Sequence, residues 1–469
     1  MSASALRPAE IADAIVAQIW SELGGDPGFP SVGFDGEGAL PSKFAVTDFA
    51  AATIGVAGAA IAEMMTEAGG APPRVTVDRT LASAWFRPVV RPIGWKSIEG
   101  SELTGEYLTG DGKWLRLHMT YPRLRSATLR ALEAEPTRES IAARVTSAPG
   151  EELETRIVEG GGAAAVLRTR AEWEAHPQGI AVASERLTAI TPTGERVSSW
   201  RPIPERPLAG IRVLDLTRVL AAPMATRFLA GYGAEVLRID PPDYEEPRGS
   251  VDVTLGKRCA RVDLRTKEGR DILVARLAEA DVVVHGYKPG VLESYGLGAE
   301  ERAAIRPGLV DVTLDAYGWT GPWRERRGFD TIVEMSNGIA ADGRDWAGSE
   351  EPVLLPVQAL DHGTGHIMAA AVVRGLLTRM RTGQGSLTRC SLARSAELLR
   401  SHLNAEGQSL VDTAEAPLDP TVRATPSGPA RRVQVPLVVD GAAQYWDRPG
   451  ELLGSSLPVW AAKTTEAQA

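Results

Sequence analysis

One aspartate of the chain has the sequence context of a nucleophile. Asp361 stands in the segment LDHGTGH, directly before an apolar stretch that predicts a helix from about residue 363 to 381. A carboxylate at a helix start faces free backbone N–H groups and the positive end of the helix dipole, which favours its ionised form. An ionised carboxylate can attack a thioester or an anhydride. Gly363 and Gly365 would let a substrate approach the backbone closely.

The same pattern has a purely structural interpretation. Aspartate is a preferred N-cap residue, so the pattern alone favours an Asp361 that only stabilises its helix. The nearby His362 and His366 are interpreted as structural histidines of the core.

Basic residues follow several predicted strands and could hold phosphate groups. Arginine suits phosphate because its planar guanidinium donates two parallel hydrogen bonds. A solvated surface explains any single member of the set equally well. The set comprises Lys257, Arg258, Arg265, Lys288 and the arginines within 324–327.

Composition excludes several classes of function. With 51 Lys and Arg against 60 Asp and Glu, the net charge is −9, so we expect no nucleic-acid partner. Cys259 and Cys390 make no disulfide framework and lack metal-ligand spacing, which favours a reducing, cytoplasmic location and no metal. Glu10 and Asp13 interrupt the start of the chain, so no export signal is seen. The apolar stretch 49–62 is shorter than the roughly 20 residues of a membrane span, so we expect a buried helix and no membrane partner.

Strands and helices alternate after a proline-rich segment near residue 205. Short apolar runs predict strands, and the helical patterns between them fall at 222–230 and 267–279. This alternation predicts a doubly wound parallel sheet with a ligand crevice at the strand ends. The first strand-to-helix crossing, DLTRVLAAPMATRF, lacks the glycines of a dinucleotide site, which disfavours a nicotinamide dehydrogenase. The predicted strands are 211–216, 234–239, 261–264 (weakly), 281–284 and 309–314.

Two parts of the chain have similar sequence patterns. Residues 48–84 and 361–396 each hold an aspartate, an Ala-rich helix, a glycine pair or Gly-x-Gly, and a short strand that ends in Thr-Leu or Ser-Leu. We interpret this similarity as an internal repeat. The alternative is that two Ala-rich helices look alike by composition alone.

Five ordered motifs resemble class III CoA-transferases, the family of formyl-CoA transferase, carnitine CoA-transferase and α-methylacyl-CoA racemase. Together they span about 190 residues, and the order makes the resemblance more specific than any one motif. It implies a Rossmann-like large domain of α/β class with a smaller α+β domain. The motifs occupy residues 207–242, 257–273, 280–298, 316–330 and 361–385.

The resemblance also implies a site and a reaction. Asp361 matches the catalytic aspartate, which would attack an acyl-CoA thioester and pass CoA to a carboxylic acid through anhydride and aspartyl-CoA thioester intermediates. Acyl-CoA, with coenzyme A as the co-substrate, and a carboxylic acid are then the small-molecule partners. The implied CoA contacts are Leu220, Ala221, Val262, Asp263, Leu264, Arg265, Gly286, Tyr287, Lys288, Arg326, Arg327, Gly328, Phe329 and Asp330.

The chain departs from the family pattern at several positions. His285-Gly286-Tyr287 replaces Glu-Asn-Phe, and Leu220 replaces a common glutamine. Phe329 replaces the histidine of the racemase branch, and racemisation needs a second proton carrier, so an acyl-CoA racemase or isomerase is the weaker alternative. The altered loop and the absence of a glycine-rich covering loop motivate a third hypothesis, a degenerate CoA-binding subunit that needs a partner chain.

The order of the family-like segments is unusual. The chain resembles the tail half of one transferase fused ahead of the head half of another, with Asp48 as a vestigial first aspartate. Family members form interlocked dimers, so we expect a homodimer. The predicted domains are an Asp-helix segment (1–94), a small domain (95–190), a proline-rich linker (191–206), a CoA-binding large domain (207–400) and a wrapping tail (401–469).

Overall fold

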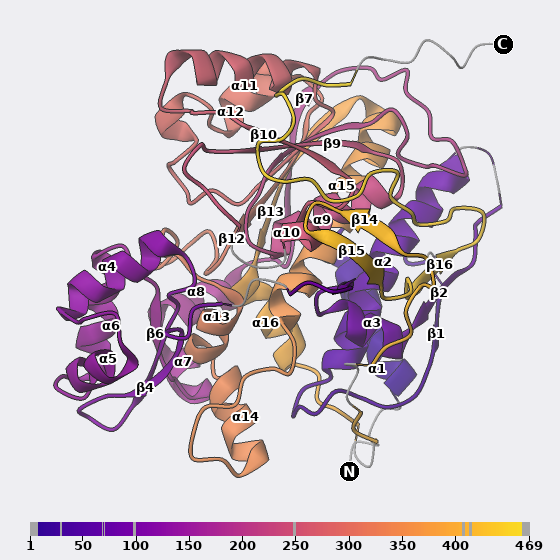
Figure 1. The fold of residues 1–469 in the computed structure, drawn as a ribbon. Coiled ribbons are helices and arrows are strands. Elements are labelled where there is room, and N and C mark those ends of the chain that lie inside the picture. The colour runs from indigo at the N-terminus through magenta and orange to yellow at the C-terminus, as the bar shows by residue number, and fades with distance from the viewer. Residues whose placement is uncertain are drawn as a thin grey trace.

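A seven-stranded sheet forms the centre of the molecule (Figure 1). The computed structural model describes residues 8–28, 31–67, 69, 71–96, 100–246, 250–405, 409–411 and 415–461. All neighbouring strands of this sheet are parallel except the last pair. In spatial order the strands are β10 (Lys257–Arg261), β9 (Glu235–Asp240), β8 (Arg212–Leu216), β11 (Val282–His285), β12 (Val310–Asp315), β13 (Gln384–Ser391) and β7 (Ala189–Glu195).

The order of the six parallel strands is that of a dinucleotide-binding fold. Numbered along the chain from β8, they run 3-2-1-4-5-6 across the sheet. The mostly parallel sheet predicted from the apolar runs is therefore confirmed. The weak strand predicted at 261–264 is misplaced, because β10 ends at Arg261. β7 lies antiparallel to β13, so the segment predicted as a linker contributes an edge strand.

Both faces of the sheet are buried. Along β11, Val282 and Val284 belong to one hydrophobic cluster and Val283 to another, as the two-residue side-chain period requires. Figure 1 shows helices on both sides of the strands. The helices and turns of this part are α9 (Ala221–Gly231), α10 (Ser250–Val253), α11 (Lys267–Glu279), the 3-10 turn η1 (Glu293–Tyr295), α12 (Ala299–Ile305), α13 (Asp330–Ser336), α14 (Ile339–Ala347), α15 (Ala359–Thr382) and α16 (Leu392–Arg400).

Helix α2 (Val46–Glu67) packs against α15 in the core. By length and composition it could span a membrane, but 94% of its most apolar window is buried inside the fold, as in the core helix of a folded protein. The buried helix predicted here is confirmed. It continues past the apolar stretch 49–62, and Glu63 forms ion pairs with Arg374 and Arg381 of α15.

The structure supports the internal repeat. α2 is followed by β2 (Val75–Asp78) and α3 (Arg79–Trp85), as α15 is followed by β13 and α16. The side chain of Asp78 caps α3, and that of Ser391 caps α16. Asp48 and Asp361 are each the third residue of their helix.

A small sub-domain, residues 105–166, protrudes from the main body (Figure 1). It has its own hydrophobic core, which includes Leu115, Ile141 and Leu153. Arg116 binds the hydroxyl of Thr331 at 2.9 Å and so connects the sub-domain to α13. Its elements are the antiparallel strands β4 (Gly105–Leu108), β5 (Trp114–Leu117) and β6 (Ala164–Val166), with α4 (Pro122–Leu132), α5 (Arg138–Val145) and α6 (Gly150–Glu159).

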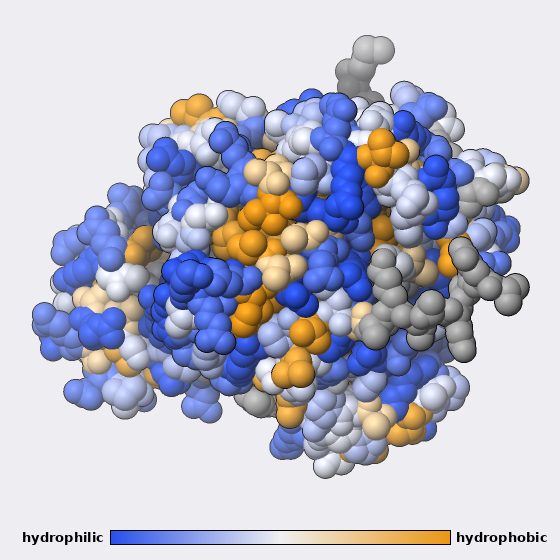
Figure 2. Space-filling view, turned by 90° about the horizontal axis from the view of Figure 1, so that it is seen from above, coloured by the Kyte–Doolittle hydropathy of each residue, from blue (hydrophilic) through white to orange (hydrophobic). Residues whose placement is uncertain are grey.

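The remaining elements surround this core. Residues 450–461 run along the edge strand β10, where the N–H of Ser456 donates to the carbonyl of Cys259. Figure 2, which views the molecule from above, shows a band of apolar side chains across this face, within a mostly hydrophilic surface. The elements are α1 (Pro8–Glu22), β1 (Val32–Asp35), β3 (Val90–Pro92), α7 (Arg170–Ala175), α8 (Pro177–Ser184), β14 (Arg423–Thr425), β15 (Gly428–Arg432) and β16 (Leu437–Val439).

Glycines of α15 accommodate neighbouring helices. A Cβ atom at position 363 would lie 2.1 Å from Cε1 of Phe49, and one at position 365 would lie 2.3 Å from the carbonyl oxygen of Ala221. The predicted substrate access at Gly363 and Gly365 is therefore wrong, because protein atoms already fill both spaces.

We expect Gly363→Ala to lower the free energy of unfolding by roughly 1–3 kcal/mol, because Phe49 has no room to withdraw. Urea unfolding checks this value. In a double-mutant cycle Phe49→Leu should recover part of the loss. A Gly363→Ala variant as stable as the wild type would contradict the close packing of α2 on α15.

Candidate active site

The carboxyl ends of the parallel strands bring most of the predicted CoA contacts to one edge of the sheet. Leu220 and Ala221 follow β8, and residues 262–265 follow β10. Residues 286–288 follow β11, and residues 326–330 follow β12. The strand order reverses between β8 and β11, which is where open α/β sheets bind their ligands.

Loops from neighbouring strands touch one another at this edge. Arg218, after β8, donates from Nη2 to the hydroxyl of Tyr287 at 2.8 Å and lies over the ring of Tyr244. Arg265, after β10, lies 3.4 Å from Asp243 in the loop after β9. These contacts hold the loops after β8, β9, β10 and β11 in one layer.

A buried glutamate that the sequence analysis missed organises the first loop. Glu246 accepts hydrogen bonds from the hydroxyls of Tyr244 (2.8 Å) and Tyr121 (3.1 Å), and Arg238 forms an ion pair with it. It also accepts from the N–H of Val219, whose φ of 69° is rare for a β-branched residue. Burial raises the pKa of Glu246. No local sequence motif marks this contact, because its partners come from three separate segments.

Asp361 occupies the first turn of α15, and its side chain is 4% exposed. Gln358 is the N-cap residue, so the purely structural alternative of an N-cap aspartate is wrong. The backbone N–H of Asp361 donates to Oδ2 of Asp330 at 2.8 Å. Within the described part of the chain, no group donates a hydrogen bond to the carboxylate oxygens of Asp361.

The electrostatics of Asp361 differ from the sequence-based expectation. Burial, and then the neighbouring Asp330, raise the pKa of Asp361 well above its ordinary value. The expectation that the helix start favours the ionised form is therefore wrong here. Desolvation in the core and a like charge outweigh the helix dipole.

Two carboxyl groups of α13 hold the chain that leads into α15. Asp330 also accepts from the N–H of Leu360, and Glu334 accepts from the N–H of Leu355 at 2.6 Å. Burial raises the pKa of both side chains, and the neighbouring Asp330 raises that of Glu334 further. The assignment of Asp330 as a CoA contact is not supported, because its fully buried carboxylate turns inward to Asp361.

The other predicted contacts separate into two groups. Val262 and Leu264 lie in a hydrophobic core. Asp263 binds Arg265 at 2.7 Å. Arg326 binds Glu154 at 2.7 Å and stacks on a tryptophan, so its charge is already paired. The side chains of these residues are engaged with the protein itself.

The surroundings of the remaining predicted CoA-contact residues differ from one residue to the next. No atom outside the local chain lies within 4 Å of the place where a Cβ of Gly286 would be. Gly328 is packed, because a Cβ there would lie 2.6 Å from the side chain of Ala316. Phe329 stacks on His118 of the small sub-domain, with ring centres 3.9 Å apart.

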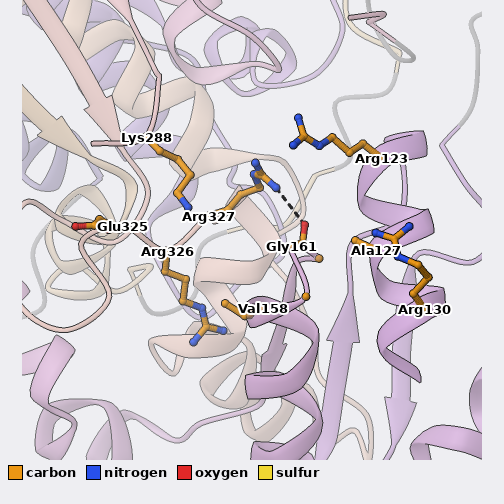
Figure 3. A pocket seen from close by; sticks show the side chains of 11 residues that line it. Arg123, Ala127, Arg130, Val158, Gly161, Lys288, Glu325, Arg326 and Arg327 are labelled. Atoms are coloured by element: carbon orange, nitrogen blue, oxygen red, sulfur yellow. Dashed lines mark hydrogen bonds between the residues drawn. The ribbon is translucent and has the colours of Figure 1, made fainter. Parts of the chain in front are cut away.

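Lys288 and Arg327 line a pocket between the large sheet and the small sub-domain (Figure 3). Its volume is about 240 Å³. Sequence reasoning missed the contribution of the sub-domain, since nothing in the local pattern of α4 indicates which face meets the sheet. The lining residues are Arg123, Ala127, Arg130, Val158, Gly160, Gly161, Gly162, Lys288, Glu325, Arg326 and Arg327.

The equivalent aspartate of the first repeat is neutralised. Asp48 is fully buried, and Arg79 binds its Oδ1 from Nη2 at 2.7 Å. Burial raises the pKa of Asp48 to about 6 against the opposing effect of Arg79.

His362 and His366 stack on Phe86, in keeping with the structural role predicted for them, and burial lowers the pKa of His366 to about 3.

The family model of CoA-transferase family III matches residues 208–417. This segment belongs to CoA-transferase family III. It holds Asp361 and all the predicted CoA contacts. In the described part of the chain, no group of three or more His, Cys, Asp or Glu residues could hold a metal ion.

Curated relatives are about one-third identical to the chain over the segments that match. It is 32% identical over 220 residues to the "Probable fatty acyl-CoA transferase Rv3272" of Mycobacterium tuberculosis, covering 43% of this chain and 55% of that protein. It is 35% identical over 205 residues to the "Succinyl-CoA:glutarate CoA-transferase" of Mus musculus, covering 40% and 46%. The chain thus spans about half the length of the curated relatives it matches.

Solved structures match over a similar share. A crystal structure of the Mycobacterium tuberculosis protein is 30% identical with a TM-score of 0.38, covering 42% of this chain and 58% of that one. A CAIB/BAIF family protein from Brucella suis is 27% identical with a TM-score of 0.37, covering 48% and 65%.

We expect Asp361→Asn to raise the free energy of unfolding at pH 8. The folded-state pKa of Asp361 lies above its unfolded value, so the wild type loses stability as pH rises through the window between them, and asparagine does not. The difference should shrink toward pH 4, as measured by urea unfolding at both pH values. The exposed Asp271→Asn is the control and should shift stability by no more than about 0.5 kcal/mol. A destabilised Asp361→Asn at pH 8 would contradict the raised pKa.

Proposed function

We propose that this chain transfers CoA from an acyl-CoA ester to a carboxylic acid through the carboxylate of Asp361. The observation that carries the proposal is that this carboxylate is buried without a donor from the described residues, at the ligand-binding edge of a segment of CoA-transferase family III. The names of the relatives, which describe acyl-CoA and CoA transfer, support this reading.

The proposed reaction proceeds by exchange at the carboxylate of Asp361. An oxygen attacks the donor thioester carbonyl, which gives an acyl–aspartyl anhydride and CoA thiolate. The thiolate attacks the aspartyl carbonyl, which releases the donor acid and leaves an aspartyl-CoA thioester. The acceptor carboxylate attacks this thioester and expels the thiolate again, and the thiolate then takes the acceptor acyl group and restores Asp361. Burial of the site excludes water, which would hydrolyse the anhydride.

Asp361 must be ionised to attack. The free-energy cost of ionising it depends on the charge of the neighbouring Asp330. An ionised Asp330 opposes the charge on Asp361. Burial raises the pKa of Asp330, and protonation of Asp330 would remove this repulsion. The charge on Asp330 therefore affects how readily Asp361 ionises.

The proposed ligand lies along the strand ends. Lys288 and Arg327 face the pocket and would bind phosphate groups. The free N–H groups at the start of α9, near Leu220 and Ala221, offer a further site for negative charge.

A second candidate function is acyl-CoA racemisation or isomerisation. The sequence disfavours it because Phe329 replaces a histidine, but His118 of the small sub-domain lies against Phe329. A histidine at that place could carry a proton. Exchange of the substrate α-proton for solvent deuterium, without any acceptor acid, would favour this function over CoA transfer.

We also propose a cytoplasmic location and a homodimer as parts of this function. Both cysteines are buried and unpaired, which supports a reducing compartment. Size-exclusion chromatography with light scattering tests the dimer.

Asp361 should become acylated during turnover. Incubation of the chain with an acyl-CoA and hydroxylamine should convert Asp361 into a hydroxamate that mass spectrometry of peptides detects. Asp361→Asn should lose CoA exchange by about 10³-fold or more, because it removes the nucleophile. Full exchange by Asp361→Asn would disprove the mechanism. CoA binding without turnover, restored by a co-expressed homologue, would instead indicate a degenerate subunit.

Asp330→Asn should move the acidic limb of the rate–pH profile to lower pH. The amide oxygen keeps the bond from the backbone of Asp361, but the like charge that raises the pKa of Asp361 is gone. Turnover measured from pH 4 to 9 checks the shift, with the exposed Asp345→Asn as the control. A limb that moves upward or not at all would show that Asp330 does not set the ionisation of Asp361.

A further inference from the structure

The pocket beside the small sub-domain holds an excess of positive charge. Arg123 and Arg130 extend from α4, and Lys288 and Arg327 come from loops at the strand ends (Figure 3). Nothing in the family resemblance marks the two α4 arginines. The acid in the lining is Glu325, which lies 3.3 Å from Arg324 and points away from the other labelled side chains in Figure 3.

Four of the five basic side chains at the pocket have no carboxylate partner among the residues that the structure describes. Arg326 is the exception, since Glu154 binds it at 2.7 Å. Within the described residues, Arg123, Arg130 and Lys288 form no ion pair, and Arg327 binds only the carbonyl of Gly161 at 3.3 Å. A group of unpaired cations that lines one pocket creates a positive local potential suited to an anion.

The unpaired cations also repel one another. Arg123 and Arg218 lower the pKa of Arg327, in addition to the effect of its burial. Bound phosphate would replace this repulsion with charge-assisted hydrogen bonds. The geometry and the charge balance therefore favour the same kind of ligand.

The wall opposite the sheet is built from glycine. Residues 160–162 line the pocket, and Gly161 has a φ of 87°, a conformation that other residues rarely adopt. A Cβ at position 161 would meet no atom within 4 Å, so the pocket is open on this side. A ligand can approach this backbone without meeting a side chain.

The pocket is connected to Asp361 through a short stretch of chain. Arg327 precedes Asp330 by three residues, a span of about 11 Å at most. Asp330 binds the backbone N–H of Asp361. The distance between a phosphate bound at Arg327 and the carboxylate of Asp361 is therefore short enough for one elongated ligand to span.

We infer that Arg123 and Arg130 of the small sub-domain, together with Lys288 and Arg327, bind the phosphate groups of the CoA ester. This inference rests on the proposed function. At about 240 Å³ the pocket holds phosphate groups rather than the whole of CoA. The sub-domain thus supplies part of the CoA site, and ligand binding ties it to the large sheet.

Calorimetric titration of the full chain tests the inference with CoA, dephospho-CoA, 3′,5′-ADP and pantetheine. Arg123→Ala and Arg130→Ala should each weaken CoA binding by about 10- to 100-fold, as expected for a lost charged hydrogen bond. Pantetheine, which lacks these phosphates, should bind all variants alike. Arg125→Ala, on the same helix but outside the pocket lining, should bind CoA like the wild type.

Comparing CoA with dephospho-CoA identifies which phosphate group the arginines bind. If the variants bind dephospho-CoA as the wild type does, the arginines hold the 3′-phosphate, and if they lose affinity for it, they hold the diphosphate. Arg123→Lys and Arg130→Lys keep the charge and should recover part of the affinity, which separates a binding role from a folding defect.

The outcomes for the two proposals are distinct. Unchanged CoA affinity in both alanine variants would overturn the inference, even if Asp361 is acylated. Arginine-dependent binding of 3′,5′-ADP without acylation of Asp361 would support the anion site and overturn the proposed transfer reaction.

Discussion

The hydrogen bond between the N–H of Asp361 and the carboxylate of Asp330 is the contact on which the site depends. It fastens the first turn of α15 to α13, and Thr331 in turn binds Arg116 of the small sub-domain. Three elements from distant parts of the chain are thereby fixed around one buried carboxylate. The same bond places two acids side by side in a buried environment, where burial and then the charge of Asp330 raise the pKa of Asp361.

The two repeats place an aspartate at the same helix position but in different roles. Asp48 and Asp361 begin equivalent helices that pack against each other. Arg79 neutralises Asp48 and makes it a structural ion pair, whereas no described group donates to the carboxylate of Asp361. A buried ion pair satisfies both of its charges, and a buried lone carboxylate raises its own pKa. The difference between the repeats lies in one partner, not in the helix.

Local pattern predicted the parts of the fold that local physics determines. The apolar runs placed β8, β9, β11 and β12 within about a residue, and the helix predicted to end near residue 381 ends at Thr382, before the left-handed Gly383. The motifs brought Lys288, Arg327 and Asp361 to the same edge of the sheet. The pattern failed where a partner comes from far along the chain. Arg326 is held by Glu154, and Gly363 is covered by Phe49; neither contact leaves a periodic signal.

The distribution of charge explains how an acidic chain can hold a polyanionic ligand. Many of its acids form ion pairs, and burial raises the pKa of Asp330, Glu334 and Asp361. The cations at the strand ends are left unpaired where the small sub-domain meets the sheet. Local potential, not net charge, attracts a ligand over short distances, because salt screens charges beyond about 10 Å. A negative phosphate end and a carboxyl-reactive thioester end would therefore each meet the part of the crevice that suits its chemistry.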